Sequence, residues 1–352
     1  MKDMYNVSAS PHVRSGVTTA GIMRDVAIAL APACLFGIYW FGISALTVLL
    51  ASVASSMAFE FLWEKLMKKP PHPYECSALV TGLLIGMNMP ASVPLWIPIV
   101  ASAFAIIVVK EMFGGLGQNF MNPALGARCF VTLCFTGRMT SFAIEKVSGS
   151  HLMHGAASID GLSSATPLAV LKNPEAFAIK QSELFSTISA GDLTVTPTPS
   201  LKNMFFGFTG GVIGETCTLA ILIGALYLLV RKVISLRIPV AYIATFAVFV
   251  LIFGGRGFDI RYLACELCGG GLMLGAWFMA TDYVTSPITK AGQIVFGILL
   301  GIMTGIIRFF SNSSEGVSYA IIFCNLLVPV IERYTMPKAF GTRKKTKGGA
   351  AK

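Results

Sequence analysis

The chain has 352 residues, of which 55% are hydrophobic and only 12% are charged, and its formal net charge is +10. Soluble domains carry about 25% charged residues, so this composition excludes an ordinary soluble protein and predicts an integral membrane protein. The positive charge does not indicate a nucleic-acid-binding protein, because basic residues gather at the ends of apolar segments and in the final RKKTKGGAAK. Basic span ends are typical of cytoplasmic edges and contact membrane lipid.

Apolar segments recur along the chain, and a membrane span needs about 20 mostly apolar residues. Several are short and interrupted by Gly or Pro, and we expect spans at 22–40, 42–62, 77–91, 94–112, 122–137, 205–230, 238–254, 262–281, 291–310 and 317–332. The predicted fold class is therefore an all-α polytopic membrane protein with about ten transmembrane helices, some of them broken.

The distribution of basic residues favours both termini in the cytoplasm. Most basic residues fall on that side of the expected path, whereas Arg256, Arg261, Arg308 and a long polar loop fall on the other side. The predicted regions are a cytoplasmic N-terminal segment, a first membrane repeat, an extracytoplasmic loop, a second membrane repeat and a basic cytoplasmic tail, at 1–20, 21–137, 138–203, 204–333 and 334–352.

Two broken segments indicate an internal repeat. ECSALVTGLLIGMNMPASVP at 75–94 and ELCGGGLMLGAWFMATDYVTSP at 266–287 both begin with Glu, contain small residues and end at a polar–Pro corner. Their starts, at 75 and 266, lie 191 residues apart. Such pairs in two halves are typical of repeats that enclose a central binding site where half-helix ends meet. The alternative is that membrane helices merely share a composition rich in Gly, Ala and Leu.

The stretch DGLSSATPL at 160–168 places the hydroxyl of Thr166 among small residues within the expected extracytoplasmic loop. A hydroxyl that is reachable from water suits a phosphoester to a flavin nucleotide, and Asp160 could orient the peptide or meet the metal of a transferase. The local sequence alone favours an ordinary turn and helix start. In that reading Ser163 or Ser164 is the N-cap and Pro167 is the first helical residue.

A glycine-rich segment, GGLGQNFMNPALGARCF at 114–130, is a second candidate site. Its candidate binding residues are Gly114, Gly115, Gly117, Asn119 and Asn122. Glycine lets a backbone approach a ligand closely, and N–H groups ahead of a helix can hold an anion or the edge of a flavin ring. The alternative is a hinge between spans. The segment is not a dinucleotide fingerprint, because it lacks the second half of G-x-G-x-x-G.

Acidic residues within apolar segments form a third set of candidates, because an acid in a membrane span is costly and tends to be functional. Asp282 lies near the end of an expected span, where Thr285 could hydrogen-bond a ring or a cation. Glu60 and Glu215 lie inside expected spans of the two halves and are candidates for an ion path. The alternative for each is a structural hydrogen bond. No metal site is expected, since CELC at 265–268 has no second ligand pair nearby in sequence.

Several segments occur together in one order over most of the chain. They are SPHVRSGVTT at 10–19, SALVTGLLIGMNMP at 77–90, KEMFGGLGQNFMNPALGAR at 110–128, DGLSSATPL at 160–168, GGVIGETCTLAILIGALYLL at 210–229, GGGLMLGAWFMATDYVTSP at 269–287 and IIRFFSNSSEGVSYAIIFCNLLVPVIE at 306–332. With these segments the chain resembles the RnfD family of membrane proteins, which belong to the Rnf complex, the ion-translocating ferredoxin:NAD oxidoreductase. It is similar, more distantly, to the B-type component of the sodium-pumping NADH:quinone reductase.

The flavinylation motif of this family is D-x-x-[ST]-G-A-T. Asp160, Ser163, Ala165 and Thr166 match it, whereas Ser164 stands where glycine is usual. The resemblance implies that a dedicated flavin transferase joins FMN through its phosphate to Thr166 outside the cytoplasm of a prokaryotic cell.

The resemblance also implies a non-covalent riboflavin held among the helices, which we expect near the 114–122 loop or the 282–285 corner. The implied function is electron transfer between ferredoxin and NAD with coupled translocation of Na+ or H+, by a subunit that is not catalytic alone. The implied partners are membrane and peripheral subunits that carry flavins and iron–sulfur clusters. The alternatives are a component of the quinone reductase, a non-redox channel or transporter, and a scaffold for other redox subunits.

Overall fold

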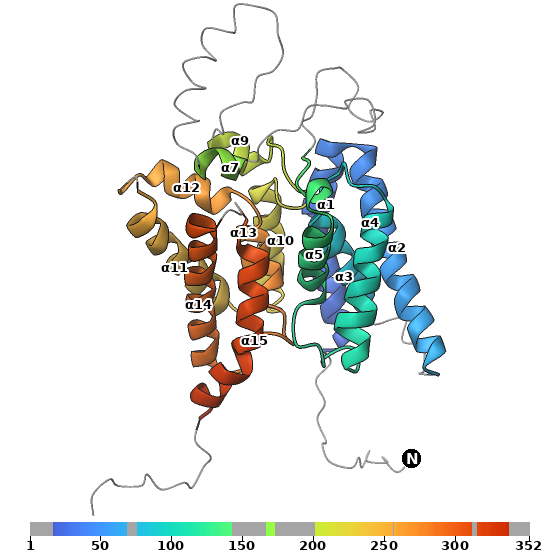
Figure 1. Ribbon diagram of the computed structural model, residues 1–352. Coiled ribbons are helices and arrows are strands. Elements are labelled where there is room, and N and C mark those ends of the chain that lie inside the picture. The colour runs from blue at the N-terminus through green and yellow to red at the C-terminus, as the bar shows by residue number, and fades with distance from the viewer. Residues whose placement is uncertain are drawn as a thin grey trace, which may run out of the picture.

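The computed structural model (Figure 1) describes residues 17–68, 76–142, 167–172, 201–255, 257–311 and 315–337, and within these all regular secondary structure is helical. In chain order the elements are α1 (Thr19–Phe41), α2 (Ile43–Leu66), α3 (Ser77–Met87), α4 (Trp96–Ala103), η2 (Phe104–Lys110), η3 (Glu111–Phe113), α5 (Pro123–Cys134), α6 (Thr136–Met139), α7 (Pro167–Lys172), α9 (Leu201–Phe206), α10 (Thr218–Val230), α11 (Arg237–Phe253), α12 (Ile260–Cys268), α13 (Leu272–Leu274), η5 (Gly275–Met279), α14 (Lys290–Phe310) and α15 (Val317–Thr335). The all-α prediction is confirmed for this part of the chain.

Many of these helices have the length and composition of membrane spans. Five stretches qualify individually: α1, α2, α4 continued through η2 and η3, α14 and α15. The pair Ile260–Cys268 and Leu272–Met279, bent by 66°, adds a sixth if it is counted as one span. Four apolar helices, α3, α5, α10 and α11, are shorter. The chain is therefore a helical protein with several apolar helices of membrane-spanning length.

The two halves of the chain form neighbouring helix groups. In the first half α2 packs against α3 and α4, and in the second half α11 packs against α14, which also contacts α15. The contact between α1 and α10 joins the groups. Figure 1 shows α7, α9 and α12 together at one end of the bundle, while α15 ends at the opposite end.

Small residues allow the two groups to approach closely, as is usual between membrane helices. A Cβ atom added at Gly224 of α10 would lie 2.0 Å from the backbone oxygen of Ala29 in α1. On the outside of the bundle, large apolar side chains such as Leu35, Leu226 and Phe310 are exposed. Such a surface suits contact with lipid.

Two expected spans are interrupted. The span expected over 205–230 is not one continuous helix, because α9 ends at Phe206, residues 207–217 are unwound and α10 begins at Thr218. Glu215 therefore lies ahead of a helix and not inside one. Gly207, at the break, has a φ of +92°, and a Cβ there would lie 2.5 Å from Phe36 Cε1. The span expected over 262–281 is broken at 269–271, where Gly270 has a φ of +63°, and the sequence predicted a broken segment there.

Candidate functional site

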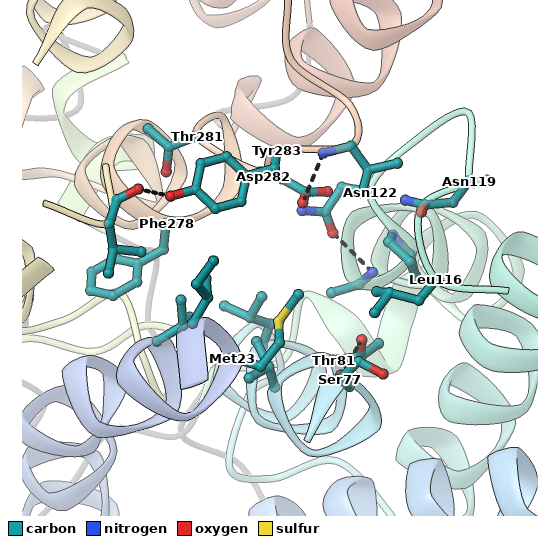
Figure 2. Close-up of a pocket in the computed structure, with 18 of the residues that line it drawn as sticks. Met23, Ser77, Thr81, Leu116, Asn119, Asn122, Phe278, Thr281, Asp282 and Tyr283 are labelled. Carbon is teal, nitrogen blue, oxygen red and sulfur yellow. Dashed lines mark hydrogen bonds between the residues drawn. The ribbon is translucent and has the colours of Figure 1, made fainter. Parts of the chain in front are cut away.

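A pocket lies between the first turns of α1, the start of α3 and the loops that follow η3 and η5 (Figure 2). Its volume is about 830 Å³, including the part that is open to solvent. The lining residues come from both halves of the chain: Ile22, Met23, Val26, Ser77, Val80, Thr81, Leu84, Lys110, Leu116, Asn119, Asn122, Pro123, Ala124, Leu228, Val233, Ile234, Phe278, Thr281, Asp282, Tyr283 and Val284. We call it the first pocket.

The first pocket brings together two sequence segments that were expected as separate alternatives. Asn119 and Asn122 come from the 114–122 loop and Asp282 from the 282–285 corner. Figure 2 shows the side chains of Asn122 and Asp282 next to each other, with Met23 and Ser77 across the pocket. An apolar cleft with a few convergent polar groups is the usual form of a site for a planar organic ligand.

Asn122 is held rigidly as the N-cap of α5. Its Oδ1 accepts hydrogen bonds from the backbone N–H groups of Ala124 and Leu125, at 3.1 and 3.4 Å, and Pro123 occupies the first turn. An Asn N-cap followed by Pro is a favourable helix start. The amide nitrogen of Asn122 donates to the backbone oxygen of Met279 at 3.5 Å. This N-cap therefore connects the two halves beside the pocket.

Asp282 lies in the loop after η5, where Thr285 Oγ1 donates to its Oδ2 at 3.2 Å and the N–H of Val284 lies 3.5 Å from its Oδ1. Burial raises the pKa of the Asp282 carboxyl, although these two hydrogen bonds act in the opposite direction. Thr285 does not itself line the pocket. Its role in the described structure is to orient Asp282.

The three glycines of the 114–122 loop, Gly114, Gly115 and Gly117, do not line the first pocket. Their φ angles are +121°, +97° and +91°. Left-handed backbone favours glycine, so these residues form the turn that carries Leu116 and Asn119 to the pocket wall.

Glu60, a candidate for the ion path, is part of a buried polar cluster. It forms an ion pair with Lys110, which is 3% exposed and also donates to Ser77 Oγ at 2.7 Å. Lys110 and Ser77 line the first pocket, whereas Glu60 lies behind them. Sequence reasoning missed Lys110. The available signal was a basic residue at the end of the apolar run AIIVVK, since such charges require a partner.

Arg128 of α5 joins Glu215 to a second acid. One guanidinium nitrogen contacts Glu215 Oε1 and another contacts Glu315 Oε2, which is 187 residues away in sequence. Arg128 also donates to Asn88 Oδ1 at 2.7 Å. Sequence reasoning identified Glu215 but neither Arg128 nor Glu315, although an arginine inside ALGARCF is costly to bury without such partners.

The C-terminal ends of α3 and η5 lie close together in the interior of the bundle. Asn88, directly after α3, has its amide nitrogen 4.0 Å from the sulfur of Met279, at the end of η5. These residues are 191 residues apart in sequence, which is the offset between the two similar segments. Near an axis that relates two repeats, equivalent residues are expected to meet. The contact also links Arg128, through Asn88, to the edge of the first pocket.

Arg308, which the sequence predicts to lie on the extracytoplasmic side, is a buried residue of the last turn of α14. It is 3% exposed and donates to Glu266 Oε2 at 3.1 Å and to the backbone oxygens of Glu266 and Gly269 at 2.7 and 2.9 Å. Acceptors on α12 and at its C-terminal end satisfy most of the guanidinium within the protein.

The flavinylation motif, including Asp160, Ser163, Ser164, Ala165 and Thr166, lies outside the described residues. The residue after Thr166 begins α7, as the sequence predicted. Leu168 and Leu171 are 3% and 7% exposed, and Lys172 donates to the backbone oxygen of Ser311. Burial lowers the pKa of the Lys172 ammonium. The segment is therefore anchored to the bundle directly after Thr166.

The cysteines form no disulfide, and the described parts of the chain contain no group of three His, Cys, Asp or Glu side chains that could hold a metal. Cys265 is buried and Cys268 half-buried. The CELC pair therefore has the environment of packed thiols.

Nearly the whole chain is similar to known proteins. Residues 6–341 match the model of the NQR2, RnfD, RnfE family. The D component of the Na+-translocating ferredoxin:NAD+ oxidoreductase complex of Acetobacterium woodii is 42% identical, over 96% of this chain and 96% of its own. The D component of the proton-translocating ferredoxin:NAD+ oxidoreductase complex of Clostridium ljungdahlii is 36% identical, over 97% and 98%. The D component of the ion-translocating oxidoreductase complex of Actinobacillus succinogenes is 34% identical, over 96% and 98%.

Proposed function

We propose, from the premise that the chain belongs to the NQR2, RnfD, RnfE family, that it is the RnfD-type membrane subunit of an ion-translocating ferredoxin:NAD oxidoreductase complex. The observation that carries this proposal is the match over nearly the entire chain, which includes every candidate site residue. The NAD site and the iron–sulfur ligands of such a complex then belong to partner subunits, and a flavin transferase and membrane lipid are further partners.

We further propose that FMN is joined by its phosphate to Thr166. The support is the DGLSSATPL motif together with the buried anchor that follows it, in which Leu168 packs against the unwound 269–271 segment. An anchor two residues from the attachment point limits how far the flavin can move. Flavins pass electrons singly or in pairs, which links iron–sulfur centres to NAD, and the protein sets their position and potential.

The first pocket is our proposed site for riboflavin. The residues present fit a flavin ring: Met23, Leu84 and Phe278 form apolar walls for its faces, while Asn119 and Asp282 offer hydrogen-bonding groups at an edge. Lys110, whose ammonium is ion-paired with Glu60, would place a positive charge in the wall beside a bound ring and so help to set its potential. Asn122, fixed as a helix cap, would keep the loop in place when the ring binds or leaves.

The proposed topology has ten membrane passes in two inverted five-helix repeats, with both termini in the cytoplasm and residues 138–203 outside. The support is the set of five long helices, one bent pair and four shorter apolar helices, and the contact of Asn88 with Met279 at the repeat offset. In this topology α7 belongs to the outer end of the bundle and the first pocket to the inner end. Glu60 and Glu215, each paired with a buried base, are proposed to belong to the ion path.

The test is flavin fluorescence of the subunit after denaturing electrophoresis of the purified complex. We expect a fluorescent band in the wild type that is lost in Thr166→Ala, and retained in Ser164→Gly, which restores the usual motif. Broken helices around a central pocket also favour a non-redox transporter. A dark wild-type band, from cells that contain the transferase, would support that alternative and not the electron-transfer function.

A further inference from the structure

One side chain, that of Tyr283, lies at the mouth of the first pocket. Among the described residues that line this pocket, Tyr283 is the only exposed one, with 54% of its surface accessible, whereas the others are buried or half-buried. A residue that lines a pocket and also faces the outside lies at the entrance. Figure 2 shows the Tyr283 ring extended along one side of the pocket, with its hydroxyl in a hydrogen bond.

This hydrogen bond joins two loops of the rim. The Tyr283 hydroxyl donates to the backbone oxygen of Val233, a residue 50 positions earlier in the chain. Val233 follows α10, whereas Tyr283 follows η5, and both residues line the pocket. The Tyr283 side chain therefore closes the gap between the end of α10 and the 282–285 corner.

The C-terminal end of α10 holds the acceptor in place. The N–H of Val233 donates to the backbone oxygen of Leu228 at 2.9 Å. The N–H of Lys232 donates to the backbone oxygen of Leu229 at 3.0 Å. This pair of bonds is a Schellman motif, in which the residue before Val233 adopts the left-handed conformation that usually belongs to glycine. Here that residue is Lys232, with a φ of +56°. The cap therefore fixes the carbonyl group that Tyr283 binds.

The loop that carries Tyr283 is also held, but its side chain is free to turn. Thr281 Oγ1 donates to the backbone oxygen of Trp277 at 2.8 Å, and Thr285 Oγ1 donates to Asp282 Oδ2 at 3.2 Å. These bonds fix the backbone on both sides of Tyr283. Exposed side chains change rotamer within nanoseconds, so loss of the hydroxyl contact is enough to let the ring swing outward.

We infer that Tyr283 is the gate of the first pocket. Its phenol, hydrogen-bonded to the Val233 carbonyl, retains a bound riboflavin and has to rotate outward before the flavin enters or leaves. The inference rests on the proposed function, because riboflavin is the proposed occupant, and it deepens that function by naming the residue that retains a ligand without a covalent bond. In the proposed topology this entrance is on the cytoplasmic side, so riboflavin would load from the cytoplasm.

The experiment measures exchange of riboflavin on the purified complex. The complex is incubated with an excess of isotope-labelled riboflavin, and the replacement of bound riboflavin is followed by filtration and mass spectrometry. FMN that is covalently attached does not exchange. Tyr283→Phe keeps the ring and removes its hydrogen bond, and Tyr283→Ala removes both. Tyr227→Phe is the matched control, because the Tyr227 phenol donates to Asp25 Oδ1 at 3.0 Å near the same end of α10 but does not line the pocket.

We expect Tyr283→Phe to exchange riboflavin about 2- to 10-fold faster than the wild type, as for the loss of one hydrogen bond between neutral groups. Tyr283→Ala should exchange faster still, because the ring no longer covers the entrance. Tyr227→Phe should exchange at the wild-type rate. Melting temperatures of both Tyr283 variants should stay close to that of the wild type, which separates a gate from a residue that only stabilises the fold.

Wild-type exchange in Tyr283→Phe, or equal acceleration in Tyr227→Phe, would overturn the gate and leave riboflavin as the proposed ligand. A wild-type complex that holds no exchangeable riboflavin would remove the proposed ligand and this inference with it. Flavin fluorescence of the same samples after denaturing electrophoresis reports on the covalent FMN, and so on the electron-transfer function, independently of the gate.

Discussion

Arg128 is the residue whose replacement should affect the bundle most. It binds Glu215, Glu315 and Asn88, and it joins helices of both halves. In Arg128→Met the apolar stem remains but two carboxylates lose their shared base. Loss of one partner from a buried ion pair costs about 3–5 kcal/mol, and because this base serves two acids we expect a loss near the upper value, about 5 kcal/mol in the free energy of unfolding.

The chain contains a matched control for this change. Arg231 pairs with Asp25 at 3.2 Å, but the side chain of Arg231 is 57% exposed. An exposed pair contributes about 0–1 kcal/mol. Arg231→Met should therefore melt close to the wild type, whereas Arg128→Met should melt far below it in thermal scans of the purified protein in one detergent.

A double variant separates loss of the base from general damage to packing. Adding Glu215→Gln to Arg128→Met removes one of the two uncompensated charges, so we expect part of the lost stability to return. Equal melting temperatures for Arg128→Met and Arg231→Met would refute the reasoning, because the buried network would then contribute no more than a surface pair.

Three further predictions concern the packing. Gly224→Ala places a methyl group 2.0 Å from a backbone oxygen and should lower the free energy of unfolding by about 1–3 kcal/mol, as measured in thermal melts. Gly137→Ala is the control and should not destabilise the protein, because nothing lies within 4 Å of the added methyl group. An equal loss of stability in both variants would contradict this reasoning. Tyr242→Phe removes the buried 2.6 Å hydrogen bond between the Tyr242 and Thr304 hydroxyls and should lower the free energy of unfolding by about 1 kcal/mol. An unchanged melting temperature would show that this hydrogen bond does not stabilise the fold. Leu168→Ala should loosen α7, so that trypsin cleaves after Lys172 faster than in the wild type; an unchanged rate would show that Leu168 does not anchor the segment.

The long helices could be predicted from the sequence because α1, α2, α14 and α15 are uninterrupted apolar runs. The extent of the unwound 207–217 segment could not, since its four glycines disfavour a helix but its apolar residues resemble those of a span. Its backbone is satisfied by distant groups: the N–H groups of Ile213 and Gly214 donate to the backbone oxygens of Met89 and Met87 at 3.1 and 2.8 Å. A local pattern cannot reveal hydrogen bonds of this kind.

The candidate site was predicted in part. Asn122 and Asp282 were both identified, but as alternative positions, and only the fold shows that they line one pocket. The pairings of Glu60 with Lys110 and of Glu215 with Arg128 span 50 and 87 residues. The sequence indicates that a buried acid needs a partner, but it does not identify which base the helix packing will supply.

The most direct test of the central claim is the mass of the proteolytic peptide that contains Thr166, isolated from the native complex. We predict that this peptide carries the added mass of FMN less one water, and that fragmentation assigns the phosphoester to Thr166. An unmodified peptide from a complex that contains its flavin transferase would contradict the account.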